Sequence, residues 1–132
     1  MEHKSVLKLL NYKVNQIHFD LNPDFDSKDF NVKPTFKREI NKIDADKAQV
    51  VLKISMNSTQ EAPSPFALQI VISGVFELKD WENSNPEIMK VNTVAILFPF
   101  LRSLLATVTC NAAVPPYVLP VLNINALLED SD

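Results

Sequence analysis

The stretch ILFPFLRSLLATVTCNAAVPPYVLPVL, Ile96 to Leu122, decides how the chain folds. Its first half predicts a helix, because one set of apolar side chains recurs at helical spacing: Leu97, Phe98, Leu101, Leu104, Leu105 and Val108. Asn92 or Thr93 can cap the start of this helix. Ile96 and Phe100 point away from the main apolar face. One face can therefore pack on a sheet, and the remaining apolar surface needs a second covering.

The same stretch is a poor membrane anchor. A spanning helix needs about 20 predominantly apolar residues. A window of this length that starts early includes Arg102 near its middle, and inserting an arginine there costs about 2.5–3.5 kcal/mol. A window placed further downstream includes Pro115, Pro116 and Pro120, which interrupt a helix. The sequence therefore predicts no membrane insertion.

Two strands are predicted upstream. Residues 12–21 alternate in two phases, with a slip at Asn15 and Gln16 that predicts a strand with a bulge. Residues 32–40 alternate as a half-buried strand. Pro34 cannot donate to a hydrogen-bond ladder, so this strand is expected at an edge of the sheet.

Two further strands follow before the helix. Residues 50–56 present one apolar face, and residues 66–78 are apolar on both faces in places, which is typical of a central strand. Gly74, the only glycine, predicts a bulge or a close approach of another group to the backbone. Four strands followed by a long helix predict an α+β domain with an antiparallel sheet.

Composition indicates one domain, residues 1–132, with material for a core, since 46% of the residues are apolar. The net charge of −3 argues against nucleic acid as a partner, because phosphates require clustered basic residues. Cys110 is the only cysteine, which excludes a disulfide and favours a reducing cytoplasmic location. The first twenty residues lack the apolar run of an export signal.

Catalytic and metal chemistry find little support. His18 lies between Ile17 and Phe19, so we expect its ring on the opposite face, toward solvent. We expect Cys110 to be a buried small residue rather than a nucleophile. The aspartates of residues 20–29 lack the glycine and distal glutamate of a calcium loop. We therefore predict no enzyme activity, no metal and no cofactor.

The motif ILFPFLR, followed by VPPYVLPVLNINALL, resembles the SecB family of protein-export chaperones. QIHFDLN (Gln16–Asn22) is similar to the family's first strand, and KDF (Lys28–Phe30) to its K-D-W element. VVLKISM and PFALQIVISGVFEL are similar to its third and fourth strands. The resemblance covers roughly residues 8–128.

This resemblance implies a four-stranded antiparallel sheet in the order 1-4-3-2, with one long helix and a truncated second helix on one face. It also implies a homotetramer, a dimer of dimers, in which the same helix of another subunit covers the surplus apolar surface. The residues expected at this oligomer interface are Ile96, Phe98, Pro99, Phe100 and Arg102.

The resemblance further implies an ATP-independent holdase that keeps export-bound chains unfolded in an apolar groove and passes them to the SecA motor. Phe30 takes the place of the family's groove tryptophan, with Phe25 beside it; either ring could instead fold over its own sheet. Further client-binding residues are expected after the helix: Val114, Tyr117, Leu119 and Val121.

Docking to SecA is less well matched than client binding. The family docks through acidic residues on the outer sheet face and through its C-terminal tail. Asp20 matches an acidic position, whereas Gln16 and Gln69 stand where carboxylates are usual, and the chain ends at Asp132. One alternative is a SecB-like chaperone dedicated to a single partner such as an antitoxin. An alternative of a different class is a carrier of hydrophobic small molecules.

Overall fold

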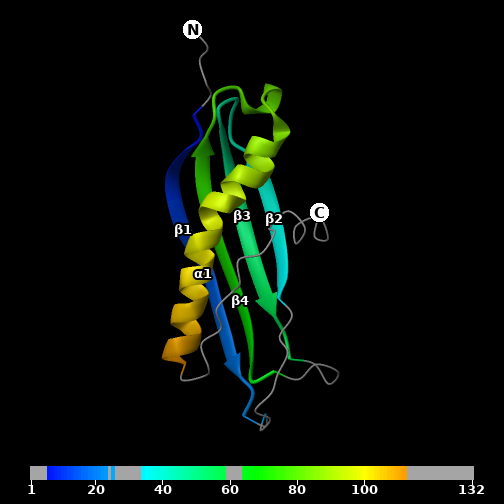
Figure 1. Ribbon diagram of the computed structural model, residues 1–132, viewed down its shortest axis with the longest axis vertical. Helices are drawn as coiled ribbons and strands as arrows, with labels where there is room; N and C mark the ends of the chain where they lie inside the picture. The colour runs from blue at the N-terminus through cyan, green and yellow to red at the C-terminus, as the bar shows by residue number, and fades with distance from the viewer. Residues whose placement is uncertain (1–5, 24, 26–33, 59–63, 113–132) are drawn as a thin grey trace.

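The protein forms a long, twisted antiparallel sheet with one helix crossing it diagonally (Figure 1). The computed structural model describes residues 6–23, 25, 34–58 and 64–112. The elements in chain order are β1 (Lys8–Leu21), β2 (Thr35–Lys42), β3 (Lys47–Met56), β4 (Phe66–Glu77), a 3₁₀ turn η1 (Trp81–Asn83), a π-helical turn η2 (Ile88–Asn92) and α1 (Thr93–Asn111).

The strand order β1-β4-β3-β2 confirms the expected topology. β4 lies between β1 and β3, as its two apolar faces predicted. β2 lies at an edge, and Pro34 directly precedes it. The α+β fold class is therefore confirmed; the short second helix that the resemblance implies falls on residues outside the described part of the chain.

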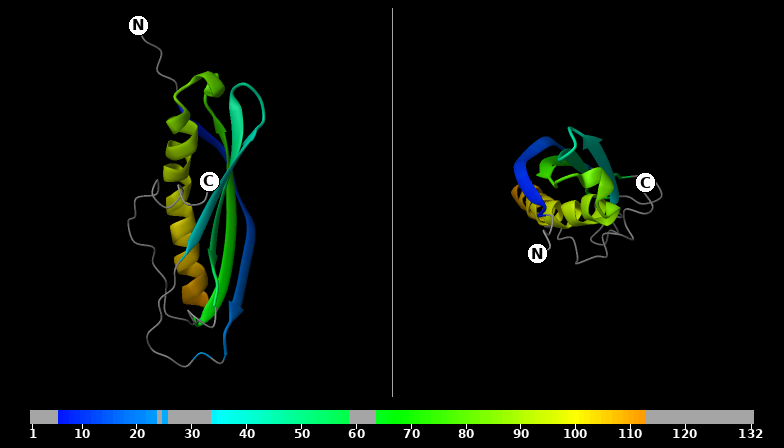
Figure 2. Two further views of the ribbon diagram at one scale, coloured as in Figure 1. Left: turned by 90° about the vertical axis from the view of Figure 1, so that its right-hand side faces the viewer. Right: turned by 90° about the horizontal axis from the view of Figure 1, so that it is seen from above.

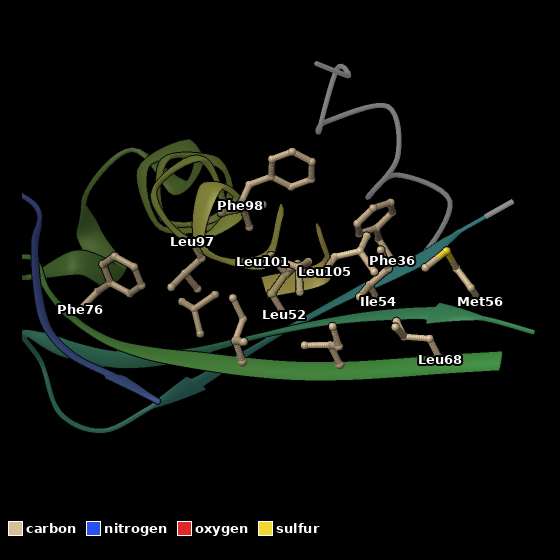
Figure 3. Close-up of a cluster of buried hydrophobic side chains, with 14 of the residues drawn as sticks. Phe36, Leu52, Ile54, Met56, Leu68, Phe76, Leu97, Phe98, Leu101 and Leu105 are labelled. Atoms are coloured by element: carbon tan, nitrogen blue, oxygen red, sulfur yellow. The ribbon is translucent and has the colours of Figure 1, made fainter. Parts of the chain in front are cut away.

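The core lies between the sheet and α1, which covers one face (Figure 2). Side chains of β3 alternate between buried and half-buried, as a sheet with one covered face requires. From α1, Leu97, Leu101 and Leu105 point down onto the sheet, whereas the Phe98 ring projects to the side, with its centroid 6.0 Å from that of Phe36 (Figure 3). Burying each such side chain stabilises the fold by about 1.5–3 kcal/mol.

The segment Ile88–Asn111 is long and apolar enough to cross a membrane by length and composition alone. Its buried side chains belong to the core cluster of the sheet, which identifies it as the core helix of this domain. Arg102 and the exposed Ser103 follow one another in its middle.

β1 contains the predicted bulge. Its pairing with β4 shifts register between Val14 and Gln16, and shifts again between Leu9 and Asn11. In a regular strand Val14 and Ile17 would lie on opposite sides of the sheet. The extra residue between Val14 and Gln16 puts both side chains on the same side.

Gly74 lies where the packing leaves little room, as the sequence predicted. A Cβ at this position would lie 2.8 Å from Leu9 Cδ1, 3.0 Å from Phe76 Cε2 and 3.1 Å from Leu97 Cδ2. Glycine therefore allows Leu97 of α1 and Leu9 of β1 to approach β4 together.

The start of the helical region differs from the expectation. Asn92 has helical dihedral angles and no capping hydrogen bond, and the helical turns begin at Pro86. The side-chain Oδ1 of Asn85 accepts a hydrogen bond from the Glu87 amide at 3.0 Å, which is the N-cap arrangement. Asn85 caps the helix because Pro86, with its fixed φ and missing N–H, suits the first helical position.

The expectation of a buried Cys110 was wrong. Its side chain is exposed, because this last turn of α1 turns Thr109 toward the core and the next residue away from it. The expected exposure of His18 is confirmed.

Candidate binding surface

Several large apolar side chains remain uncovered on the α1 side of β1. Val14, Ile17 and Leu21 pair with Ile72, Ile70 and Phe66 of β4, whose side chains are all buried on the α1 side. Val14 is nevertheless 43% exposed, Ile17 48% and Leu21 57%. Phe100 of α1 is 42% exposed. Tyr12, Val14, Ile17, Leu21 and Phe100 are called the β1–α1 surface below.

This surface arises from where α1 packs. α1 has its main contacts with β3 and β4, so among the described elements no layer covers much of β1. Where α1 does approach β1, the rings of Tyr12 and Phe100 stack with centroids 4.6 Å apart. Partial burial in this contact raises the pKa of the Tyr12 hydroxyl, because desolvation disfavours the phenolate.

The free edge of β1 adjoins these side chains. Within the described strands β1 pairs with β4 alone, so the backbone N–H and C=O groups along its other edge have no strand partner. An edge strand of 14 residues is a template for pairing with another chain. The surface therefore offers both apolar contact and backbone hydrogen bonds to an extended polypeptide.

The residues predicted for the oligomer interface divide into two groups. Phe98 is buried in its own protomer, at 7% exposure, with its ring 6.0 Å from that of Phe36. Pro99 and Phe100 are exposed, and Ile96 and Arg102 are half-buried. Pro99 and Phe100 are therefore the members of this set that lie on the exposed side of α1.

The structure describes one of the predicted client-binding residues. Phe25 is half-buried, and its amide donates a hydrogen bond to the Asn22 carbonyl at 3.2 Å, so it lies in a turn directly after β1. The others lie outside the described residues and remain predictions: Phe30, Val114, Tyr117, Leu119 and Val121.

Val14, Ile17 and Leu21 were not predicted as site residues. Their spacing predicted a strand but did not predict that these side chains are exposed, since an apolar face of a strand is normally part of the core. The two-phase alternation was the available signal, because a bulge on an edge strand often re-aims side chains.

On the opposite face of the sheet, the predicted docking residue Asp20 is exposed, and its carboxylate accepts a hydrogen bond from His18 at 2.6 Å. Beside this pair, Gln69 Nε2 donates to Gln16 Oε1 at 2.7 Å. These four side chains border a shallow hollow of about 360 Å³. Among the described residues, no three His, Cys, Asp or Glu side chains are grouped to hold a metal.

Comparison with known proteins decides the family. The model of the family described as preprotein translocase subunit SecB matches residues 22–132. The chain belongs to the SecB family. An uncharacterized protein of Methanocaldococcus jannaschii is 35% identical over 130 residues, 95% of this chain and 84% of that protein. The protein-export protein SecB of Anaplasma phagocytophilum is 35% identical over 85 residues, 61% of this chain.

The match spans 54% of that SecB protein, about half of its length. Among solved structures, a SecB-like chaperone of Mycobacterium tuberculosis, in complex with a peptide from an antitoxin, superposes with a TM-score of 0.71 at 12% identity. The superposition covers 89% of this chain and 91% of the other. The two proteins share the SecB fold.

Proposed function

We propose that the protein is a SecB-type holdase that binds unfolded polypeptides without ATP and without catalysis, in the cytoplasm. The observation that carries this proposal is the β1–α1 surface, an apolar strip beside a free strand edge in a member of the SecB family. Its clients are unfolded chains, because these expose apolar side chains and unpaired backbone groups together.

The chemistry of the surface suits a client that has no fixed sequence. Backbone pairing along a strand edge is independent of side-chain identity, and aliphatic contacts are nondirectional. Covering a half-exposed aliphatic side chain stabilises a complex by roughly 1 kcal/mol, half the value for full burial. Because each contact contributes little, many different clients can bind and can be released again. Preferential binding of the unfolded state opposes folding of the client by mass action.

We further propose that the protein is a homo-oligomer, a dimer of dimers. Pro99 and Phe100 on the outward side of α1, with the edge of β1, would contact another copy. Clients would lie along the apolar side chains that the assembly leaves exposed, with Phe25 at the end of β1 contributing to the groove. The oligomer extends one short apolar strip into a longer one.

Binding to a permanently unfolded protein tests this function directly. Reduced and alkylated α-lactalbumin cannot re-form its disulfides, and the oxidised, folded protein is its matched control. Fluorescence anisotropy without nucleotide should show binding to the unfolded form only. Equal affinity for both forms, or none for either, would refute the proposal.

A second candidate is a chaperone dedicated to one partner, favoured by the fold shared with a SecB-like chaperone that was solved with an antitoxin peptide. Such a protein would bind one disordered segment tightly and ignore unrelated clients. A carrier of hydrophobic small molecules would instead release a lipid-sized ligand on organic extraction. The three outcomes are distinguishable on the same purified protein.

Transfer of clients to SecA would depend on the outer sheet face. Asp20 is the acidic position that matches the family's docking surface. Asp20→Lys should weaken SecA binding if this residue docks the motor; unchanged affinity for SecA would remove it from the docking surface.

A further inference from the structure

The sheet face opposite α1 carries an excess of positive charge. Figure 2 shows α1 on one face of the sheet and no described element on the other. The register of the four strands places on this outer face the lysines Lys8, Lys13, Lys37, Lys47 and Lys53, and the carboxylates Asp20, Glu39 and Glu77. The outer face of the described strands is therefore positive, although the whole chain has a net charge of −3.

Two of the three carboxylates of this face lie near strand ends. Asp20 is near the end of β1 and is paired with His18. Glu77 ends β4 and stands in register with Lys8 on one side and Lys47 on the other. Glu39 stands midway along β2, in register with Val51, and is the one carboxylate of this face beside Lys37 and Lys53.

Lys37 and Lys53 occupy the most unusual position. They are direct cross-strand partners in the β2–β3 ladder, and like charges that face each other in this way destabilise a sheet. The ion pairs found between described residues involve neither of them. Glu39 shares this face two residues after Lys37 and offsets at most one of the two charges, so an excess of positive charge remains at the pair.

Apolar side chains adjoin the two lysines. Val71 of β4 is in register with Lys53, and Val51 lies two residues before Lys53 on the same face of β3. Lys37, Lys53, Val51 and Val71, together with Arg38 and Glu39, line a shallow hollow of about 470 Å³ on the outer face. All four side chains are exposed or half-buried.

We propose that the outer face binds an acidic polypeptide segment. Its carboxylates pair with Lys37 and Lys53, and apolar side chains between them pack on Val51 and Val71. The partner is chosen by charge, since a negative segment relieves the repulsion between two lysines that a neutral or basic one leaves in place. This site is separate from the β1–α1 surface, because the two lie on opposite faces of the sheet.

The sign of the charge distinguishes this site from the docking that the family resemblance implied. That docking uses acidic residues on the chaperone, and here Gln16 and Gln69 hydrogen-bond to each other at two of the expected positions. A basic patch among valines selects the opposite kind of partner surface.

The test uses two fluorescein-labelled peptides of 16 residues, one of repeating Asp-Leu-Glu-Ser units and one of repeating Lys-Leu-Lys-Ser units. Fluorescence anisotropy with the full chain at low salt should show tighter binding of the acidic peptide. Lys37→Glu with Lys53→Glu should weaken that binding at least tenfold. Lys79→Glu with Lys90→Glu changes the total charge equally at exposed positions outside the strands and should leave binding nearly unchanged.

Three results would overturn the proposal. The acidic peptide fails to bind, the two double variants weaken it equally, or single-stranded DNA of the same length competes more strongly than the acidic peptide. The milder pair Lys37→Gln and Lys53→Gln, checked for folding by circular dichroism, should also lose affinity. Binding of unfolded α-lactalbumin should persist when Lys37 and Lys53 are both changed to Glu or both changed to Gln. Failure of this site and failure of the holdase function are therefore separable.

Discussion

The ring of Tyr12 on β1 stacks on the ring of Phe100 on α1, with the two planes inclined by 27°. This contact joins the helix to β1, which lies outside its main contacts with β3 and β4. It also fixes the start of the exposed apolar strip that continues through Val14 and Ile17. A single aromatic pair thus belongs both to the packing of the protomer and to the surface that we assign to binding.

Two neighbouring phenylalanines should differ sharply when truncated. Phe98→Ala should lower the free energy of unfolding by about 3–5 kcal/mol, because the ring is buried against the sheet. Phe100→Ala should cost only about 0.5–1.5 kcal/mol, the value of an aromatic pair, since the ring is 42% exposed. Urea unfolding of both variants makes the comparison. The comparison concerns the single protomer, so it is made at a protein concentration at which the chain is monomeric; equal losses there would contradict the core position of Phe98.

Tyr12 should make stability depend on alkaline pH. Its pKa is raised in the folded protein, so the neutral phenol is favoured and its contribution is complete below the ordinary pKa of about 10. That contribution should be lost as the pH rises through the folded-state pKa. Tyr12→Phe keeps the ring and removes the titration. Above pH 10 the free energy of unfolding of wild type should therefore fall relative to that of Tyr12→Phe, as measured by chemical unfolding. A difference between the two proteins that does not change with pH would contradict this.

The cap of the helical region should lie at Asn85. Asn85→Ala should lower stability by about 1 kcal/mol, because the Glu87 amide loses its acceptor. Asn92→Ala is the control, since its side chain makes no capping hydrogen bond, and it should be nearly neutral. Thermal unfolding of the two variants suffices. The reverse order would mean that the helix starts at Thr93.

The edge of β1, which we propose to contact another copy, should control assembly. Ile17→Glu places a charge in the apolar strip at a side chain that is already 48% exposed, so the protomer should stay folded. Wild type should sediment as a dimer or tetramer at micromolar concentration, and Ile17→Glu should shift it toward the monomer. His18→Glu changes the adjacent residue on the outer face and should leave the sedimentation coefficient unchanged. A monomeric wild type would refute the assembly.

Local patterns predicted the architecture well because the sheet has one covered face. The alternation in residues 50–56 and 66–78 reports burial directly, and the phase slip in β1 reported a real register shift. Gly74 was informative since a residue without a Cβ in a central strand needs a neighbour close to it.

Features that depend on the position of α1 escaped prediction. Val14 and Ile17 are exposed because α1 packs on β3 and β4. The alternation of apolar residues in β1 does not reveal where the helix will pack. The exposure of Cys110 has the same origin at the far end of the helix. The start of the helical turns was missed for a different reason, since the cap was expected at Asn92 or Thr93 and Asn85-Pro86 was not used as a start signal.

Refolding of an unrelated protein, diluted from denaturant without nucleotide, tests the holdase function most directly. A several-fold excess of this chain should suppress both refolding and aggregation of the reporter, and Phe25→Ser should weaken the effect with little change in melting temperature. Undiminished refolding of several unrelated reporters, from a protein shown to be folded and oligomeric, would contradict a general holdase.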